Sequence, residues 1–261
     1  MPQIPQRPIE LPKAKVVNVT PAAKPAAAAK SARGEIVPTA FFAAYAFFQL
    51  LSSGVIVALS GVNGEFGSIE AWLSTAVNAV ACCHYYQIYQ ARRSKEGDES
   101  LVVDVLRYSD WIVTLPLMAH ELRLSVTVAN QASEFYLPSW SVSVLAGFTV
   151  FFGGVWKFYC RSCRKPRTPD QIVIGTGAFA ASCVCFLLVT VDLLNGLGPI
   201  ESAARRWLAA LTVAWYGYPV VALARRTDKV SETISDFCFA ALDTFTKGGL
   251  ALYAAGVIGA S

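Results

Sequence analysis

A lysine lies in the middle of the last long apolar stretch of this 261-residue sequence. Lys247 belongs to the run 237-FCFAALDTFTKGGLALYAAGVIG-259, where a free ammonium in lipid would be unfavourable by several kcal/mol. It must therefore be neutralised, paired or chemically modified. Asp243 precedes it by four residues, the spacing at which side chains of one helix meet. The pair is either a structural ion pair or the centre of a functional site, and we favour the site because intramembrane charges are usually functional.

A second set of polar residues occupies the segment 107-RYSDWIVTLPLMAHELR-123. Its members are Arg107, Asp110, Thr114 and Glu121. Their separations of three, four and seven residues place all four on roughly one helix face. Asp110 and Glu121 are then about 16 Å apart along the axis, or half a bilayer. A polar seam between helices is the alternative, but two acids, an arginine and a further Asp–Lys pair exceed what packing requires.

The composition indicates a protein with several membrane-spanning helices. Of all residues, 54% are hydrophobic and 15% are charged, a departure from the soluble average in the membrane direction. A helix needs about 20 apolar residues to cross the hydrocarbon core. Seven stretches qualify, at 36–60, 68–92, 101–129, 136–160, 170–195, 202–225 and 231–259. Their short connections predict an all-α membrane protein, a compact bundle of seven transmembrane helices.

Residues 1–35 differ from the rest of the sequence. They are rich in Pro, Ala and Lys and contain no run that could build a core, which predicts a disordered tail. The transmembrane domain is therefore expected at residues 36–261. Cys160 and Cys163 form a C-x-x-C at the head of a basic loop, which could bind metal or form a redox pair. A lone C-x-x-C is weak evidence, so we assign no metal site.

Three motifs resemble those of the microbial rhodopsins. Arg-Tyr-Ser-Asp-Trp-x-x-Thr-x-Pro at 107–116 and Asp-x-x-x-Lys at 243–247 are similar to the family's third and seventh helices. The residues 215-WYGYP-219 resemble its retinal-pocket motif W-x-x-Y-P. The resemblance covers residues 36–259. It implies a bundle with all-trans retinal in its core, bound to Lys247 as a protonated Schiff base.

The resemblance also implies how charge is arranged around Lys247. Asp110 and Asp243 are similar to the family's paired counterions, and Asp110 would accept the Schiff-base proton after photoisomerisation. Arg107 would hold the charge balance of these carboxylates and gate the exit side.

A retinal pocket is implied by the same resemblance. Its residues would be Trp111, Met118, Trp215, Tyr218 and Pro219. Met118 occupies the position where the family tunes colour, and its apolar side chain predicts green rather than blue absorption. Ala222 stands where pumps of the family often carry an aromatic residue, which predicts a more open ring end of the pocket.

Asp110, Thr114 and Glu121 look like the acceptor, threonine and donor pattern of proteorhodopsin-type proton pumps. Apolar surroundings favour the neutral form of a carboxylic acid, so Glu121 can stay protonated until it resupplies the Schiff base. Sodium-pumping and chloride-pumping relatives replace the acceptor aspartate, which this chain keeps. The resemblance therefore implies a light-driven proton pump.

Two histidines and one further acid have two alternative roles each. His84 resembles the histidine that proteorhodopsins pair with the acceptor aspartate, and a bond to a backbone carbonyl is the alternative. His120 has no family role, but it could perturb Glu121 or bind metal with a nearby cysteine. Asp236 could belong to a proton-release group, although we expect an exposed carboxylate at a helix end.

The direction of transport is predicted differently by two arguments. If the helices alternate across the membrane, 17 lysines and arginines lie in the tail and the connections on its side, against three on the opposite side. The positive-inside rule then places the N-terminus in the cytoplasm. The family places it outside. We keep the family orientation and predict outward pumping.

Two other functions stay open, a sensory photoreceptor that signals through a membrane partner and a light-gated ion channel. Glu121 favours the pump over the sensor, and a channel should carry more polar residues on its second helix than Asn78, His84, Gln87 and Gln90. We expect a transporter of the cell membrane rather than an enzyme, because no soluble catalytic domain follows residue 261. Its expected partners are protons, membrane lipid and further copies of the chain in a trimer or pentamer, and not nucleic acid.

Overall fold

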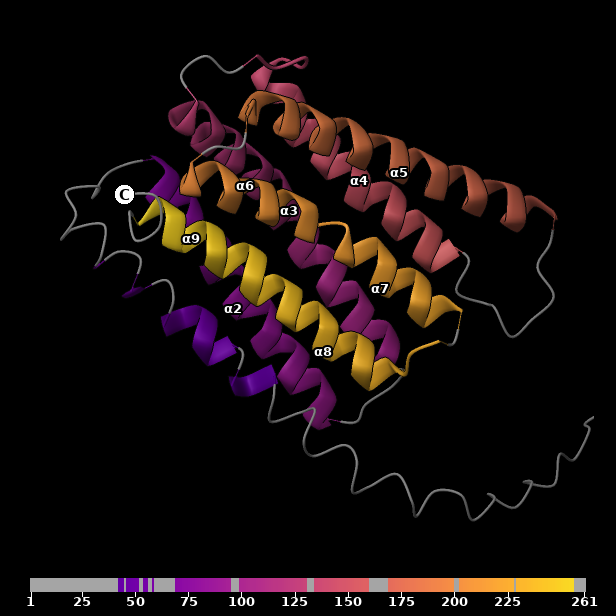
Figure 1. Ribbon diagram of the computed structural model, residues 1–261. Coiled ribbons are helices and arrows are strands. Elements are labelled where there is room, and N and C mark those ends of the chain that lie inside the picture. Colours follow the sequence, from indigo (N-terminus) through magenta and orange to yellow (C-terminus); the bar gives the residue numbers. More distant parts are fainter. Residues whose placement is uncertain are drawn as a thin grey trace, which may run out of the picture. The chain divides into compact units, whose positions relative to one another are not determined.

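The structure is a computed structural model. It describes residues 42–44, 46–51, 54–55, 58, 69–94, 99–130, 134–159, 169–199, 202–227 and 229–255. Within these ranges all regular structure is helical and no strand occurs (Figure 1). The predicted all-α fold is confirmed. The predicted tail at residues 1–35 and the C-x-x-C of Cys160 and Cys163 lie outside the described residues.

The helices follow the predicted spans closely. Four spans are continuous helices: α2 Ile69–Ser94, α3 Glu99–Ala129, α4 Ser139–Tyr159 and α5 Pro169–Leu197. The sixth span holds α6 Ala203–Ala214 and α7 Gly217–Arg226, and the seventh holds α8 Glu232–Asp243, the π-helical turn η2 Thr244–Gly248 and α9 Gly249–Ala254. Helical residues between 42 and 58 occupy the first span. Counted over the described ranges, the chain therefore forms a seven-helix bundle, as predicted.

The outer surface of the bundle is apolar. Four helices are long and apolar enough to cross a membrane, at Leu101–Ala129, Ser139–Phe158, Pro169–Leu197 and Ala203–Arg226. Large apolar side chains are exposed along them, among them Phe148 and Phe151 on α4 and Leu187 and Leu188 on α5. Such side chains are stable on an outer face when lipid surrounds it. The protein is a multi-pass membrane protein.

Helix six is interrupted at Trp215 and Tyr216, between α6 and α7. Pro219 has no N–H to donate to the carbonyl of Trp215, so the regular helical pattern cannot continue through this turn. Gly217 then brings α7 close to α8, because a Cβ atom at this position would lie 2.6 Å from Leu242 Cδ2. The interruption and the close approach together set the position of the W-x-x-Y-P motif.

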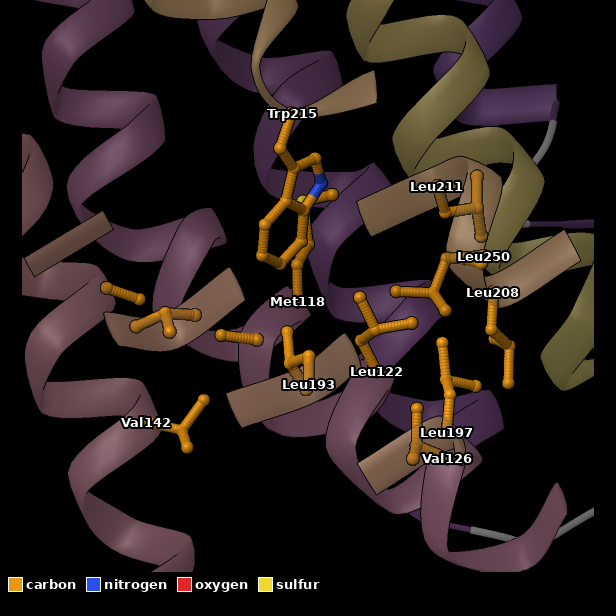
Figure 2. Packing of buried hydrophobic residues seen from close by; sticks show 14 of the residues in the cluster. Met118, Leu122, Val126, Val142, Leu193, Leu197, Leu208, Leu211, Trp215 and Leu250 are labelled. Atoms are coloured by element: carbon orange, nitrogen blue, oxygen red, sulfur yellow. The ribbon is translucent and has the colours of Figure 1, made fainter. Parts of the chain in front are cut away.

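The main apolar core contains buried side chains of α2, α3, α4, α5, α6 and α9. Figure 2 shows Met118, Leu122 and Val126 of α3 with Leu193 and Leu197 of α5, Leu208 and Leu211 of α6 and Leu250 of α9. A second cluster packs Phe42 and Ala46 against Ala81, Tyr85 and Ile88 of α2 and Ala240 of α8. The first helix is thereby held against helices two and seven. These clusters enclose the polar residues of α3.

Candidate functional site

Lys247 lies at the centre of the bundle, on the π-helical turn η2. Its Nζ donates a hydrogen bond of 2.6 Å to Asp110 Oδ2 and lies 3.5 Å from Asp243 Oδ2. All three side chains are buried, with exposed fractions of 2% or less. A π-helical turn is wider than an α-helical turn and is common at functional sites. The structure therefore brings the two predicted counterions to the predicted attachment lysine.

Two tyrosines donate hydrogen bonds to Asp243, one to each carboxylate oxygen. Tyr85 of α2 donates to Asp243 Oδ2 over 2.5 Å, and Tyr218 of α7 donates to Oδ1 over 2.5 Å. The Tyr218 hydroxyl also lies 3.0 Å from Thr246 Oγ1. Both carboxylate oxygens of Asp243 are thus hydrogen-bonded. Sequence reasoning missed Tyr85. Its spacing of four residues from Ala81 and seven from Asn78, which places it on the same buried face of α2, was the signal that could have found it.

His84 lies between its two predicted partners. Its Nδ1 is 3.0 Å from the carbonyl oxygen of Val80 and 3.9 Å from Asp110 Oδ1. The shorter contact is a hydrogen bond to the backbone, which is the alternative that the sequence left open. The longer contact still places the imidazole beside the carboxylate. Asp110 Oδ1 is buried and has no hydrogen-bond partner within the described ranges, so it is available to His84.

Arg107 pairs with Asp236 rather than with Asp110 or Asp243. Its Nη2 donates 2.9 Å to Asp236 Oδ1, and its Cζ lies 4.9 Å from the centre of the Phe239 ring. Asp236 is buried, with an exposed fraction of 3%, so the expected exposed carboxylate at a helix end is wrong. It is buried because Arg92 of α2 and Arg107 of α3 both donate to it over 2.9 Å.

A buried acid that sequence reasoning missed completes this network. Asp104 lies 3.2 Å from Lys157 Nζ, 3.2 Å from Arg225 Nη1 and 3.9 Å from Arg107 Nη1. Arg225 also lies 3.0 Å from Glu232. We call these residues the ion network; its members are Arg92, Asp104, Arg107, Lys157, Arg225, Glu232 and Asp236. It ties α2, α3, α4, α7 and α8 together. Asp104 precedes Arg107 by three residues, a spacing that places both on one helix face, and this was the signal by which the sequence could have identified it.

Glu121 lies on the opposite side of Lys247 from the ion network. It is buried, and its Oε1 accepts a hydrogen bond from the Ser74 hydroxyl of α2. Thr114, between Asp110 and Glu121, is also buried and donates 3.0 Å to the backbone carbonyl of Asp110. The predicted stripe on α3 is therefore interior along its whole length. Ser74 had no distinguishing feature in the sequence.

His120 is half-buried beside Glu121 on α3. Among the described residues, no group of three His, Cys, Asp or Glu side chains lies close enough to hold a metal ion. The metal site that His120 could have formed with a cysteine therefore has no support in this part of the chain.

A cavity of about 350 Å³ opens beside Lys247. All six residues expected to bind the cofactor line it: Trp111, Met118, Trp215, Tyr218, Pro219 and Lys247. The Trp111 ring makes edge contacts with Tyr218 and Phe239, with centroids 5.3 Å and 5.2 Å apart. The volume of the cavity lies in the range of small-molecule sites, and the cavity is lined mainly by apolar side chains with a few polar groups.

The part of the cavity near Ala222 is bordered by aromatic side chains of other helices. Trp156 of α4 and Phe179 of α5 line the cavity and pack beside Ala222, with their ring centroids 4.9 Å apart. The guanidinium carbon of Arg226 lies over the Trp156 ring, 4.4 Å from its centre. Aromatic rings from α4 and α5 thus stand where an aromatic residue at position 222 is missing.

A sequence model of the family described as bacteriorhodopsin-like protein matches residues 37–258. The chain belongs to this family. Bacteriorhodopsin-like proteins sit in membranes and normally bind retinal, and the Lys247 cavity has the amine and the apolar walls that such a ligand needs. None of the curated proteins compared with the chain matches it in sequence.

Solved structures with the same bacteriorhodopsin-like fold include pumps and part of an enzyme. A light-driven proton pump from Leptosphaeria maculans is 17% identical, with a TM-score of 0.64 over 84% of this chain and 95% of that chain. Xanthorhodopsin, a light-driven ion pump with dual chromophore, is 15% identical, with a TM-score of 0.61 over 85% and 93%. The transmembrane domain of a Salpingoeca rosetta rhodopsin phosphodiesterase is 14% identical, with a TM-score of 0.57 over 87% and 87%. At such identities the likeness shows the fold alone.

Proposed function

We propose that the protein is a light-driven proton pump that moves protons outward. The observation that carries this proposal is the position of buried acids on both sides of Lys247. Asp110 lies within hydrogen-bond distance of the amine, and Glu121 lies about 16 Å further along α3. One acid can take a proton from the Lys247 nitrogen while the other returns a proton to it.

Retinal is the cofactor that fits this cavity, since an apolar polyene aldehyde would find an amine at Lys247 and rings at Trp111 and Trp215. Bound there, it would supply the absorption of light and the photoisomerisation that starts the cycle. Lys247 would hold it, and Trp111, Trp215 and Tyr218 would restrict the ways in which it can rotate. Met118 and Pro219 would complete the walls.

Asp110 is the better proton acceptor of the two counterions. Its Oδ2 is 2.6 Å from Lys247 Nζ, whereas Asp243 Oδ2 is 3.5 Å away. Hydrogen bonds to a carboxylate stabilise its charged form. Asp243, which accepts hydrogen bonds from two tyrosines, therefore remains the permanent counterion, and Asp110 takes the proton.

Arg107 separates Asp110 from the rest of the ion network. Its side chain is bound to Asp236, and it follows Asp104 and precedes Asp110 on α3. A fixed cation at this place opposes the return of a proton to Asp110. Release on this side would therefore proceed past Arg107 through the carboxylates of the ion network.

Outward transport requires this ion network to face the exterior. Three cations of the basic side, Arg92, Lys157 and Arg225, are paired with acids inside the bundle. On the other side Arg123 is likewise paired, 2.6 Å from Asp192. With these paired cations left out, the count is still 14 against two, so the positive-inside rule continues to favour the opposite orientation. The family orientation is retained on the family resemblance alone.

The buried Glu121 favours a pump over a sensory photoreceptor, because a sensor has no need of a second acid held by Ser74 in the other half of the bundle. A light-gated channel would need more polar lining on helix two. The buried face of α2 does carry Ser74, Asn78 and Tyr85, but Ser74 and Tyr85 are bound to acids rather than open to a pore. We further propose a homo-oligomer, a trimer or a pentamer, on the family resemblance.

The test is the light-induced pH change of cells that express the protein and are supplied with retinal. We expect acidification that a protonophore abolishes and that Lys247→Ala and Asp110→Asn lack. Alkalinisation would reverse the direction and support the charge asymmetry. A coloured protein that completes a photocycle without any pH change would contradict the pump and favour the sensor.

A further inference from the structure

The resupply of protons from Glu121 must cross an apolar layer. The apolar side chains of Met118, Leu122 and Leu250 belong to one cluster, which Figure 2 shows. Met118 stands between Asp110 and Glu121 on α3. Glu121 lies about 16 Å from the level of Asp110, whereas a hydrogen bond spans about 3 Å. A chain of intermediate hydrogen-bonding groups is therefore needed between the donor and the Lys247 nitrogen.

Asn78 is placed in this layer by α2. Ser74, one turn before it, donates to Glu121, and Tyr85, two turns after it, donates to Asp243. All three belong to the buried face of α2, and Asn78 is 0% exposed. Asn78 therefore lies between the level of the donor and the level of the counterion.

The carboxamide of Asn78 is half satisfied. Its Nδ2 donates 2.8 Å to the backbone carbonyl of Ser74, which fixes the orientation of the amide. Its Oδ1 is buried and, within the described ranges, has no hydrogen-bond partner. Glu121 Oε2 is likewise buried and has no hydrogen-bond partner within these ranges. Buried polar atoms of this kind are normally satisfied by water, and a site needs several polar partners to hold it.

We propose that Asn78 is a positioning residue for proton resupply, and this inference rests on the proposed pump function. Asn78 Oδ1 accepts a hydrogen bond from water that links Glu121 Oε2 to the Lys247 nitrogen. In the transfer Glu121 loses its proton and becomes a carboxylate, each water accepts one proton and donates another, and the Lys247 nitrogen gains one. Asn78 neither gains nor loses a proton.

The test is the rate at which resting-state absorption recovers after a flash in Asn78→Leu, which has nearly the same shape but no acceptor. We expect recovery to slow by about tenfold, the factor of a lost hydrogen bond in the transfer step, while the initial release of a proton keeps its rate. Gln87→Leu is the matched control, because Gln87 is an exposed amide on the same helix, and its recovery should not change. Asn78→Asp keeps an acceptor oxygen and should recover within about threefold of the original rate.

A structural role alone would give a different pattern. If Asn78 merely caps the Ser74 carbonyl, Asn78→Leu will melt at a lower temperature while its recovery rate stays the same, and the inference is overturned. The double variant Asn78→Leu/Glu121→Gln should be no slower than Glu121→Gln, since both act on one route. If Glu121→Gln itself recovers normally, the proposed donor fails; if it slows recovery and Asn78→Leu does not, only this inference fails.

Discussion

Arg107 and Asp236 form a buried ion pair that joins α3 to α8, with Arg107 Nη2 2.9 Å from Asp236 Oδ1. The second oxygen of Asp236 is bound by Arg92 of α2 at the same distance. The charge of Arg107 is therefore committed to the ion network, and the Lys247 nitrogen is the cation that pairs directly with Asp110 and Asp243.

Removing Asp236 should destabilise the bundle. In Asp236→Asn, Arg92 and Arg107 lose their charged partner, and breaking a buried ion pair in this way costs about 3–5 kcal/mol. Thermal denaturation followed by circular dichroism should show a melting temperature several degrees lower. Asp170→Asn is the control, because Asp170 is exposed at the start of α5 and should change the melting temperature little. Equal melting temperatures in the two variants would show that the ion network does not stabilise the fold.

Retinal binding should depend on one lysine. Lys247→Ala removes the amine from the cavity, so added retinal should give no visible absorption band beyond that of free retinal. Lys229→Ala removes an exposed lysine outside the cavity, and this variant should form the normal absorption band with retinal. Absorption spectra of the two variants after incubation with retinal make the comparison. A normal band in Lys247→Ala would place the attachment elsewhere.

Glu121→Gln should slow proton resupply. A positioned acid contributes about 10²–10⁴-fold to such a transfer, so recovery after a flash should slow by about 100-fold at neutral pH. Protons must then come from solution, and recovery should become slower as the pH rises, by about tenfold per unit. Glu134→Gln, which alters an exposed acid, should keep the original rate and its weak pH dependence. Recovery of Glu121→Gln that is fast and independent of pH would contradict the donor role.

Ala222 and Trp156 should behave as a packing pair. Ala222→Trp adds a large ring beside Trp156 and Phe179, and overpacking of this kind costs about 1–3 kcal/mol. We expect slow and incomplete uptake of retinal by this variant. The double variant Ala222→Trp/Trp156→Ala should restore uptake, because one ring replaces the other. If the double variant takes up retinal no better than Ala222→Trp does, the two positions do not share the end of the cavity.

Part of the site was predictable from spacing within single helices. Lys247 with Asp243, and Asp110 with Glu121, are related by helical geometry that one sequence contains. The contact between Asp110 and Lys247 joins two helices, and it was expected only from the family resemblance. The apolar runs also predicted spans two to six, and the start of the seventh, to within a few residues, since bilayer thickness sets their length. The interruption of helix six at Trp215 was not predicted, although Pro219 is its cause.

What was missed depends on contacts between helices. Asp236 was expected to be exposed because it lies near a helix end, but Arg92 and Arg107 come from two other helices to surround it. Tyr85 and Ser74 likewise gain their importance from acids on neighbouring helices. A single sequence gives the face that a residue occupies, but not the residue that faces it.

The account depends most directly on Asp110 taking the proton from Lys247. Time-resolved infrared difference spectroscopy records the carbonyl stretch of a carboxylic acid as it becomes protonated after a flash. We predict a band that appears as the proton leaves Lys247, is lost in Asp110→Asn and persists in Asp243→Asn. A band that persists in Asp110→Asn and disappears in Asp243→Asn would contradict the assignment of acceptor and permanent counterion.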